Sequence, residues 1–332
     1  MAIKLKGDEI EFDTFPMLQT ATGVEFAGKI SATEFIVIDF STIFQGGVSG
    51  YNSGGRNSNA RNTIDKFPFA SDANATDVGD LTVTRFNLAG QSSPVSGYSS
   101  GGITSPPYNG VNVIDKFSFA SNANATDVGD LPVIYYGNIG QSSTVSGYST
   151  GGSTPTPTSL NRILKFPFAS NANATDIAAL VGTNNVYSAG QSSTVSGYAS
   201  GGGPTAVNVI QKFPFATNAN ATDVGDLTQL AGTGPAGQSS EDYGYTSGGR
   251  PTSNMIDRFP FATDANATDA GDLTVGRTRV AGQSSLASGY TSGGSPTPAS
   301  NIIDKFSFAS VANAADVGDL TLGRYGPAGH QV

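Results

Sequence analysis

The sequence contains no cysteine and no tryptophan, and only one of its 332 residues is histidine. Without cysteine no disulfide can form, so packing must hold the fold together. A zinc or copper site with several histidine or cysteine ligands is excluded for the same reason. We therefore expect neither a metal site nor another cofactor.

Charge and long apolar runs are also scarce. Only 13% of the residues are charged, and the formal net charge is −9. An acidic balance argues against nucleic acid as a partner, because binding to phosphates requires clustered Lys and Arg. No apolar run approaches the roughly 18 residues of a transmembrane helix, and the opening MAIKLKGDEIEF lacks the apolar core of a signal peptide. We expect a protein that folds in a cytoplasm and does not insert into a membrane.

The dominant feature that is present is a repeat. Versions of KFPFASDANATDVGDL begin at Lys66, Lys116, Lys165, Lys212, Arg258 and Lys305. Two further landmarks recur with them, GYxSGG or a close variant and AGQSS. The phenylalanine that follows the first residue of the repeat recurs every 46–50 residues. A period of about 40–50 residues with short β-like pieces is typical of propeller blades.

Each repeat divides into four strand candidates, around AGQSS, VSGYSSGG, VIDKFPFA and TDVGDL. Gly, Ser, Asn and Pro lie at the junctions, as hairpin turns require. Six such units predict an all-β fold, a six-bladed β-propeller with four-stranded blades over residues 46–332. The small residues should lie near the crowded axis, and Phe67, Phe69 and their equivalents should fill the core between blades.

The two ends of the repeat region are out of phase. The chain enters at GGVSGYNSGG, the second strand of a unit, and leaves at GRYGPAGHQV, the first strand. Residues 324–332 should therefore pair beside residues 47–55 in one composite blade. Such pairing of the N- and C-terminal strands removes two exposed edges.

The repeat resembles a divergent kelch repeat. TVGR with Arg277, GYTSGG with Gly293 and Gly294, and IDKFSF at residues 303–308 follow one another in the kelch order. The sequence departs from that family because the usual Trp is missing and the Arg is present only at Arg85, Arg277 and Arg324. The resemblance implies a propeller but no particular chemistry, because propellers have many functions.

Residues 1–45 lie outside the repeat. MAIKLKGDEIEF followed by GVEFAGKISATEF resembles the short attachment regions of bacteriophage tail-fibre and head-decoration proteins. The repeats are also similar to repeat proteins of phages that infect aquatic bacteria such as cyanobacteria. The resemblance implies an anchor or oligomerisation segment over residues 1–45, contacts with other virion proteins, a possible homotrimer, and localisation in the virion.

Several motifs have structural explanations. NAT is a glycosylation sequon at Asn74 and at four later copies, but a turn explains its recurrence better, with Asn and Asp side chains capping their own backbone. DANATD is a poor calcium loop, because Asp72 becomes Asn in later repeats. His330 occupies the position that Gln91 has in an earlier repeat, which indicates a tolerated substitution.

No residue is predicted to be catalytic. The carboxylates Asp77 and Asp80 recur in most of the repeats, whereas a glycosidase pair is usually unique. Nothing supports a Ser–His–Asp triad around the single histidine. We therefore expect a protein that is not an enzyme.

Function is expected on one face of the disc. Loops between the second and third strands, such as residues 56–63 and 103–113, differ in every repeat, and they share a face with the connectors between blades. We term this the variable face. The turns on the opposite, invariant face, such as residues 141–147 and 119–127, are nearly identical.

We predict that the variable face recognises a host surface glycan or protein. The candidate ligand-binding residues are Tyr108, Asn109, Arg56, Arg61 and Arg250. They offer an aromatic platform and hydrogen-bond donors, which suit a sugar. Two functions remain open. One is a non-enzymatic virion structural protein, in a tail fibre, head fibre or capsid decoration, and the other is a free lectin-like or protein-binding kelch propeller.

Overall fold

The structure is a computed structural model that describes residues 18–20, 23–25, 45–156, 158–183, 185–203, 205–249, 251–295 and 298–332. The chain divides into two compact units, Met1–Ile43 and Phe44–Val332. In the first unit, β1 (Leu18–Thr20) pairs antiparallel with β2 (Gly23–Glu25). The rest of the predicted anchor lies outside the described residues.

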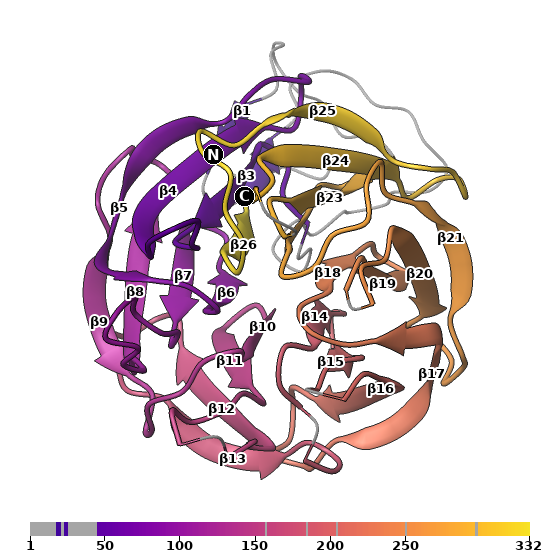
Figure 1. Ribbon diagram of the computed structural model, residues 1–332, viewed down its shortest axis with the longest axis horizontal. Coiled ribbons are helices and arrows are strands. Elements are labelled where there is room, and N and C mark those ends of the chain that lie inside the picture. The colour runs from indigo at the N-terminus through magenta and orange to yellow at the C-terminus, as the bar shows by residue number, and fades with distance from the viewer. Residues whose placement is uncertain are drawn as a thin grey trace, which may run out of the picture. The chain divides into compact units, whose positions relative to one another are not determined.

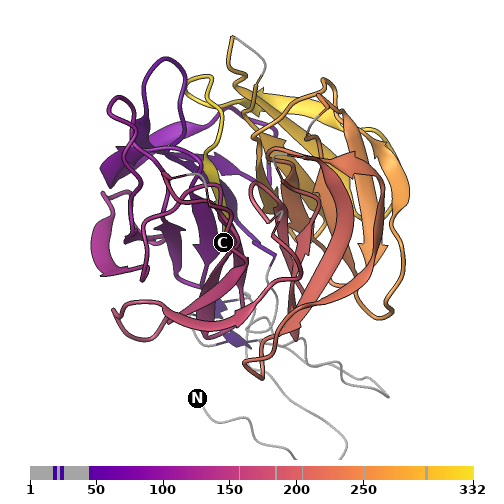
Figure 2. The same ribbon diagram turned by 60° about the horizontal axis from the view of Figure 1, so that its bottom comes forward.

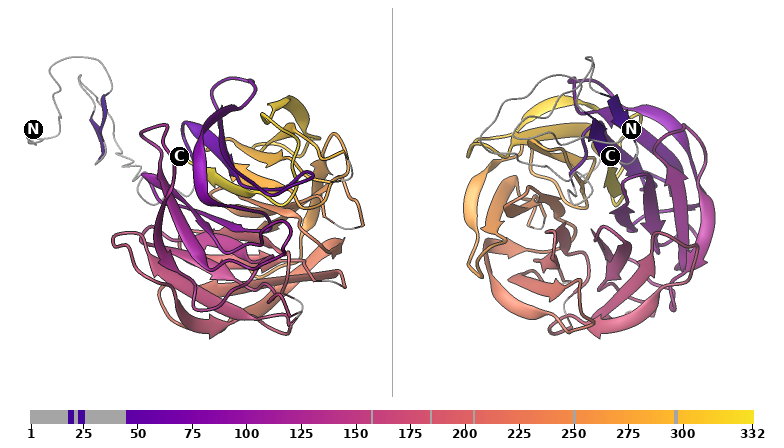
Figure 3. Two further views of the ribbon diagram at one scale, coloured as in Figure 1. Left: turned by 60° about the vertical axis from the view of Figure 1, so that its left-hand side comes forward. Right: turned by 180° about the vertical axis from the view of Figure 1, so that it is seen from behind.

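The second unit is a ring of six four-stranded antiparallel sheets, shown along its axis in Figure 1 and from behind in Figure 3. The predicted all-β class and six-bladed β-propeller are confirmed. The described residues form strands and no helix, and hence no helix long and apolar enough to cross a membrane.

The strands of each blade follow one another from the axis outward. The innermost strands are β26 (Ala328–Gln331), β6 (Ala89–Ser92), β10 (Ile139–Ser142), β14 (Ala189–Ser192), β18 (Ala236–Ser239) and β22 (Ala281–Ser284). The second strands are β3 (Ser49–Ser53), β7 (Ser96–Ser100), β11 (Ser146–Thr150), β15 (Ser196–Ser200), β19 (Tyr243–Ser247) and β23 (Ser288–Ser292). The third strands are β4 (Arg61–Pro68), β8 (Val113–Ser118), β12 (Arg162–Pro167), β16 (Val207–Pro214), β20 (Met255–Pro260) and β24 (Ile302–Ser307). The outer strands are β5 (Thr76–Arg85), β9 (Thr126–Asp130), β13 (Thr175–Ala179), β17 (Thr222–Ala231), β21 (Thr268–Asp272) and β25 (Ala315–Asp319).

The ring closes through a blade that contains both ends of the propeller. β26 pairs antiparallel with β3, with Ala328 opposite Ser53 and Gln331 opposite Gly50. Figure 1 shows β26, from the C-terminal end, beside β3. The predicted pairing of the terminal strands is confirmed, and it removes two exposed strand edges.

Glycine dominates the crowded axis, as predicted. A Cβ atom added to Gly140 would collide with the carbonyl oxygen of Gly90 on the neighbouring inner strand. The same collision recurs at each inner strand around the ring, including Gly329 against Gly282. Only glycine lets the six inner strands approach this closely.

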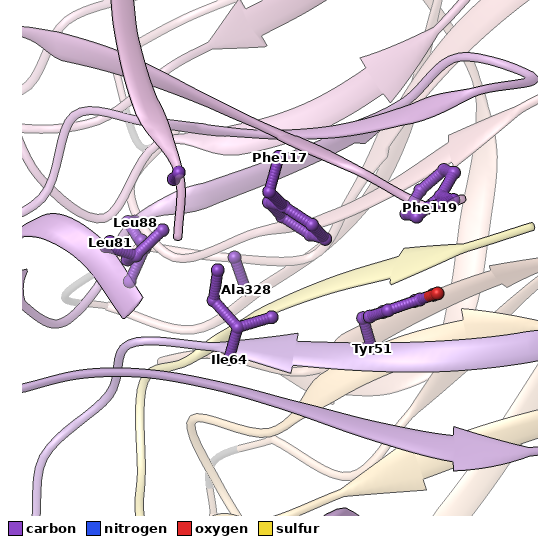
Figure 4. Close-up of a cluster of buried hydrophobic side chains, with 8 residues drawn as sticks. Tyr51, Ile64, Leu81, Leu88, Phe117, Phe119 and Ala328 are labelled. Carbon is purple, nitrogen blue, oxygen red and sulfur yellow. The ribbon is translucent and has the colours of Figure 1, made fainter. Parts of the chain in front are cut away.

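Aromatic side chains fill the wedges farther out. Tyr51 of β3 contacts Phe117 and Phe119 of the next blade, with ring centroids 5.6 and 4.9 Å apart. Figure 4 shows these rings with Ile64, which is fully buried in the same cluster. Burial of a large apolar side chain contributes about 1.5–3 kcal/mol. The aromatic trio of one Tyr and two Phe, here Tyr51, Phe117 and Phe119, therefore contributes much of the stabilising contact between blades.

The same trio completes the ring at its closing seam. Phe67 and Phe69 lie 5.5 and 4.8 Å from Tyr290 of the preceding blade. This confirms the prediction that Phe67, Phe69 and their equivalents form the core between blades.

The asparagine of the NAT motif corrects one prediction. Asn124 Oδ1 accepts the Asp80 N–H of the preceding blade at 3.0 Å, and the Ala125 N–H donates to the Asp80 carbonyl at 2.8 Å. Asn124 therefore does not cap the backbone of its own turn. Its side-chain amide contacts the outer strand of the neighbouring blade, next to a β-bulge in that strand. The aspartate half of the prediction is confirmed, since Asp77 Oδ1 accepts the Gly79 N–H at 3.2 Å.

This contact recurs at all six seams, the last one joining Asn74 to Asp319 at the closing seam. It explains why Asn313 is retained in the repeat that has lost the NAT threonine. Asn313 still accepts the Asp272 N–H at 3.1 Å. The asparagine of the NAT motif thus joins each blade to its neighbour through a hydrogen bond.

Candidate recognition face and channel mouth

The variable and invariant faces lie at opposite ends of the strands (Figure 2). On the variable face, the connectors between blades bridge to the loops that follow the second strands, as Phe86 does to Ile103 and Tyr136 to Ser153. The loops that differ between repeats and the connectors therefore form one continuous surface around the axis.

Two of the predicted ligand-binding residues come together on this surface. The Arg56 guanidinium lies over the Tyr108 ring at 5.2 Å and over the buried Phe86 ring at 5.1 Å. Tyr108 is 50% exposed. The Arg56 Nε atom is buried without a hydrogen-bond partner among the described residues. Arg56 thus fixes an exposed aromatic platform to the core.

The other predicted residues do not complete one site. Arg61 Nη2 donates to Asn57 Oδ1 at 3.1 Å, so it is held within its own loop. Asn109 is exposed beside Tyr108, and its backbone N–H donates to Thr104 Oγ1 at 3.1 Å. Arg250 lies outside the described residues.

A cavity of about 110 Å³ opens on the axis at the mouth of the channel. Backbone hydrogen bonds between successive connectors surround it. The Asn87 N–H donates to the Gly326 carbonyl at 2.6 Å, and the Gly137 N–H donates to the Asn87 carbonyl at 2.8 Å. This collar gives the mouth a rigid backbone rim.

One position of the collar has a left-handed backbone conformation in all six blades. Its residues in the six blades are Asn87, Gly137, Tyr187, Gly234, Arg279 and Gly326, with φ between 54° and 73°. Glycine adopts this left-handed conformation without strain and Asn tolerates it, whereas most other residues lose about 1–2 kcal/mol. Two blades therefore retain a larger side chain, Tyr187 or Arg279, against a local conformational cost.

The three larger side chains meet in the cavity. Asn87 Nδ2 donates to Tyr187 Oη at 3.3 Å, and the Arg279 guanidinium lies 5.8 Å from the Tyr187 ring and 5.5 Å from the Tyr325 ring. Burial raises the pKa of Tyr187 to about 12, although Arg279 opposes the shift. The hydroxyl therefore stays protonated near neutral pH and can donate.

Sequence reasoning did not single out these three residues. A signal was present, because aligned repeats show glycine at three of the six positions and thereby mark a position that requires positive φ. Asn87, Tyr187 and Arg279 are the exceptions.

The loops and connectors of the variable face contain positive but no negative side chains. The loops after the second strands occupy residues 54–61, 101–112, 151–161, 201–206, 248–254 and 293–301. The connectors, together with the last residues of the outer strands β5 and β17, occupy residues 82–88, 132–138, 181–188, 228–235, 274–280 and 321–327. None of these segments contains Asp or Glu in the sequence, although they contain Arg56, Arg61, Arg250 and Arg279. The variable face is locally positive on a protein of net charge −9.

Three arginines of the repeat are buried below this surface. Arg277 pairs with Asp304 at 2.6 Å, and both side chains are buried. Arg85 with Asp115 and Arg324 with Asp65 repeat the arrangement at two other seams. These guanidiniums hold blades together and are not available to a ligand.

The single histidine is also structural. His330 is fully buried on β26, with Nε2 2.8 Å from Ser53 Oγ. Burial lowers its pKa to about 4. It takes the place of the inner-strand glutamines, of which Gln91 donates to the Tyr148 carbonyl at 2.8 Å. Within the described ranges, no group of three or more acidic or histidine side chains could hold a metal ion.

The invariant face is where the chain enters the propeller. Gln45 Nε2 donates to the Ser239 carbonyl at 3.0 Å, and the Gly46 N–H donates to the Ser284 carbonyl at 2.8 Å. Both acceptors end inner strands on this face. Its turns also present the exposed apolar side chains Val48, Val95, Val145, Val195 and Leu286.

The fold and surface define a six-bladed β-propeller with two chemically different faces. A scan with protein-family models found no match to this chain. A search of the curated proteins found no significant match either.

Proposed function

We propose that this protein is a non-enzymatic structural protein of a bacteriophage virion, in a tail fibre, head fibre or capsid decoration, that displays the propeller for host attachment. One observation carries the proposal. The chain enters the propeller at the invariant face, where Gln45 and Gly46 bind the ends of inner strands. A propeller tethered there would present its variable face outward.

Two surface properties support this orientation. The invariant face repeats exposed valines at one turn position, Val95, Val145 and Val195, which suits contact with another virion protein. The connectors of the variable face also expose apolar side chains, including Ile134 and Val275. The variable face presents Tyr108 stacked on Arg56. An exposed aromatic ring beside donors suits a sugar, because its apolar face packs on the ring while donors reach hydroxyl groups.

The second candidate is a free lectin-like or protein-binding kelch-like propeller. It is favoured by the closure of the ring through β26 and β3, since residues 45–332 complete their own sheets without a partner. In that case residues 1–45 would have no role in assembly.

Light scattering distinguishes the two candidates. The full chain is compared with a chain that starts at Gly46, and both are mixed with purified virion proteins. We expect the full chain to form a homotrimer or bind a virion protein, and the shorter chain to do neither. Two monomers that bind no virion protein would contradict the virion proposal.

A glycan array tests which face recognises a host. The variable-face variant carries Tyr108→Ala and Arg56→Ala, and the matched invariant-face variant carries Val145→Ser and Val195→Ser. We expect only the variable-face variant to lose binding. Loss in the invariant-face variant alone would show that recognition lies on the opposite face.

A further inference from the structure

We infer that the channel mouth on the variable face binds a carboxylate-bearing sugar of the hexuronic-acid type, with Arg279 contacting the carboxylate and Tyr187 and Asn87 contacting hydroxyl groups. The inference rests on the proposed role of the variable face as a recognition surface. It names the ligand class and a second subsite, separate from the Arg56–Tyr108 stack.

The first argument is the retained strain. Arg279 and Tyr187 have φ of 54° and 58°, whereas the equivalent residues of three other blades are glycines. Residues held in such conformations cluster at functional sites, where surrounding structure maintains them. The backbone collar maintains them here, since the Tyr187 N–H donates to the Gly137 carbonyl at 2.7 Å and the Gly326 N–H donates to the Arg279 carbonyl at 2.8 Å.

The second argument is convergence. Asn87 and Tyr187 are 100 residues apart in the chain, yet their side chains are hydrogen-bonded at 3.3 Å. Arg279 lies against the rings of Tyr187 and Tyr325, which orient its guanidinium. All three converging residues line the same cavity of about 110 Å³. A small concave site with a few converging polar groups is the usual form of a ligand pocket.

The third argument is charge. Arg279 forms no ion pair with any residue that the structure describes. The loops and connectors around it contain no carboxylate in the sequence. A planar guanidinium binds a carboxylate through two parallel hydrogen bonds. An incoming carboxylate would therefore meet a preorganised and uncompensated partner.

A sugar fits better than a simple anion. Arg279 alone would satisfy an anion such as acetate. The amide of Asn87 and the hydroxyl of Tyr187 line the same cavity and add the donors and acceptors that sugar hydroxyl groups require. The ring of Tyr187, which lines the cavity, adds apolar surface for the sugar face.

Calorimetric titration of the full chain at constant ionic strength tests the ligand class. The probes are glucuronate, glucose and acetate. We expect glucuronate to bind at least tenfold more tightly than either glucose or acetate. Equal binding of acetate would overturn the sugar part of the inference, equal binding of glucose would overturn the carboxylate part, and no glucuronate binding would overturn both.

Arg279→Gly tests the location. It installs the residue found at Gly137, Gly234 and Gly326, so we expect the melting temperature to stay within about 2 °C or rise. Glucuronate binding should weaken at least tenfold. The matched control is Arg162→Gln, which removes one positive charge at the ion pair with Asp176 and should leave glucuronate affinity unchanged.

Unchanged affinity in Arg279→Gly, or equal losses in Arg279→Gly and Arg162→Gln, would overturn the site. These titrations need neither a virion nor a host. Glucuronate binding by a chain that fails the virion and array experiments would refute the proposed function while leaving this subsite established.

Discussion

Neighbouring blades meet at six seams, which are built from equivalent positions of the repeat. Two of these seams bury an aspartate at the same position, Asp304 in one and Asp257 in the other, but they stabilise its carboxylate differently. In the first, Arg277 lies 2.6 Å from Asp304, and the Thr274 hydroxyl donates to the same carboxylate at 2.6 Å. In the second, the Thr228 hydroxyl donates to Asp257 at 2.6 Å, but the position equivalent to Arg277 is Ala231. Burial raises the pKa of Asp257.

At two other seams, both the arginine and the aspartate are replaced by other residues. Gln211 donates to Asn185 at 2.7 Å in one of them. In the other, Tyr135 and Leu164 lie in one apolar cluster. This position therefore holds an Arg–Asp pair, an amide pair, an apolar pair, or an aspartate that is bonded by threonine alone. The fold requires no particular charge there, as expected where desolvation opposes ion pairing.

The largest change would break the closing seam altogether. Deleting residues 324–332 removes strand β26 and the Arg324 partner of Asp65. We expect the melting temperature to fall by more than about 10 °C, because the inner edge of β3 and the buried carboxylate of Asp65 become unpaired. Circular dichroism melts measure this, and an unchanged melt would mean that the ring does not depend on its closure.

A double-mutant cycle would convert the apolar seam into the charged one. Leu164→Asp buries an unpaired carboxylate beside Tyr135, and we expect a loss of about 3–5 kcal/mol in the free energy of unfolding. Tyr135→Arg alone should also destabilise the protein.

The two substitutions together should recover about 1–3 kcal/mol relative to their sum. Urea denaturation of all four proteins measures the coupling. Additive losses would show that Arg and Asp cannot pair at this seam, in contradiction to the comparison.

The same aspartate-to-asparagine change should have different effects in the two seams. Asp304→Asn leaves Arg277 buried without a counter-charge, and we expect a loss of about 3 kcal/mol at pH 7. Asp257→Asn removes a carboxylate that burial disfavours, so stability at pH 7 should change by less than about 1 kcal/mol or increase.

The raised pKa of Asp257 determines whether its contribution to stability rises or falls with pH. Because its pKa is raised in the folded state, its contribution to stability is present in acid and is lost as pH rises through that pKa. The advantage of Asp257→Asn over the parent should therefore shrink as pH falls toward 4. Equal losses for both asparagine variants at pH 7 would remove the distinction between the seams.

The last prediction concerns His330, the exception among the inner-strand glutamines. Its pKa of about 4 in the folded state lies below the ordinary value of 6.5 for histidine, so the unfolded chain binds the proton more readily. Stability should fall by about 2 kcal/mol from pH 7 to pH 5 through this group, which His330→Gln would remove. Urea denaturation of both proteins at each pH measures the difference, and identical pH profiles would contradict it.

Much of the scaffold was predictable because it depends on one repeat. The recurrence of Phe67 and its equivalents every 46–50 residues indicated the number of blades, and the phase difference between the chain ends indicated the pairing of β26 with β3. The predicted site was only partly recovered. Arg56 and Tyr108 come together, whereas Arg61 is held by Asn57.

The missed features all join residues from different blades. Asn124 binds the backbone of Asp80, 44 residues earlier, and Asn87 binds Tyr187 across the mouth. Spacing within one repeat contains no information about which side chain of the next repeat lies opposite. The prediction that the NAT asparagine caps its own backbone was wrong for this reason.

The sequence by itself determined the strand pattern, the six-fold repetition and the closure, because period-two strands and glycine-rich turns act locally and identically in each copy. Only the tertiary structure decided which partners meet at each seam, and which three residues meet at the channel mouth. The physical reason is that a ring brings every copy of one position to a common axis. Side chains that are distant in the chain, such as Asn87, Tyr187 and Arg279, thereby become neighbours.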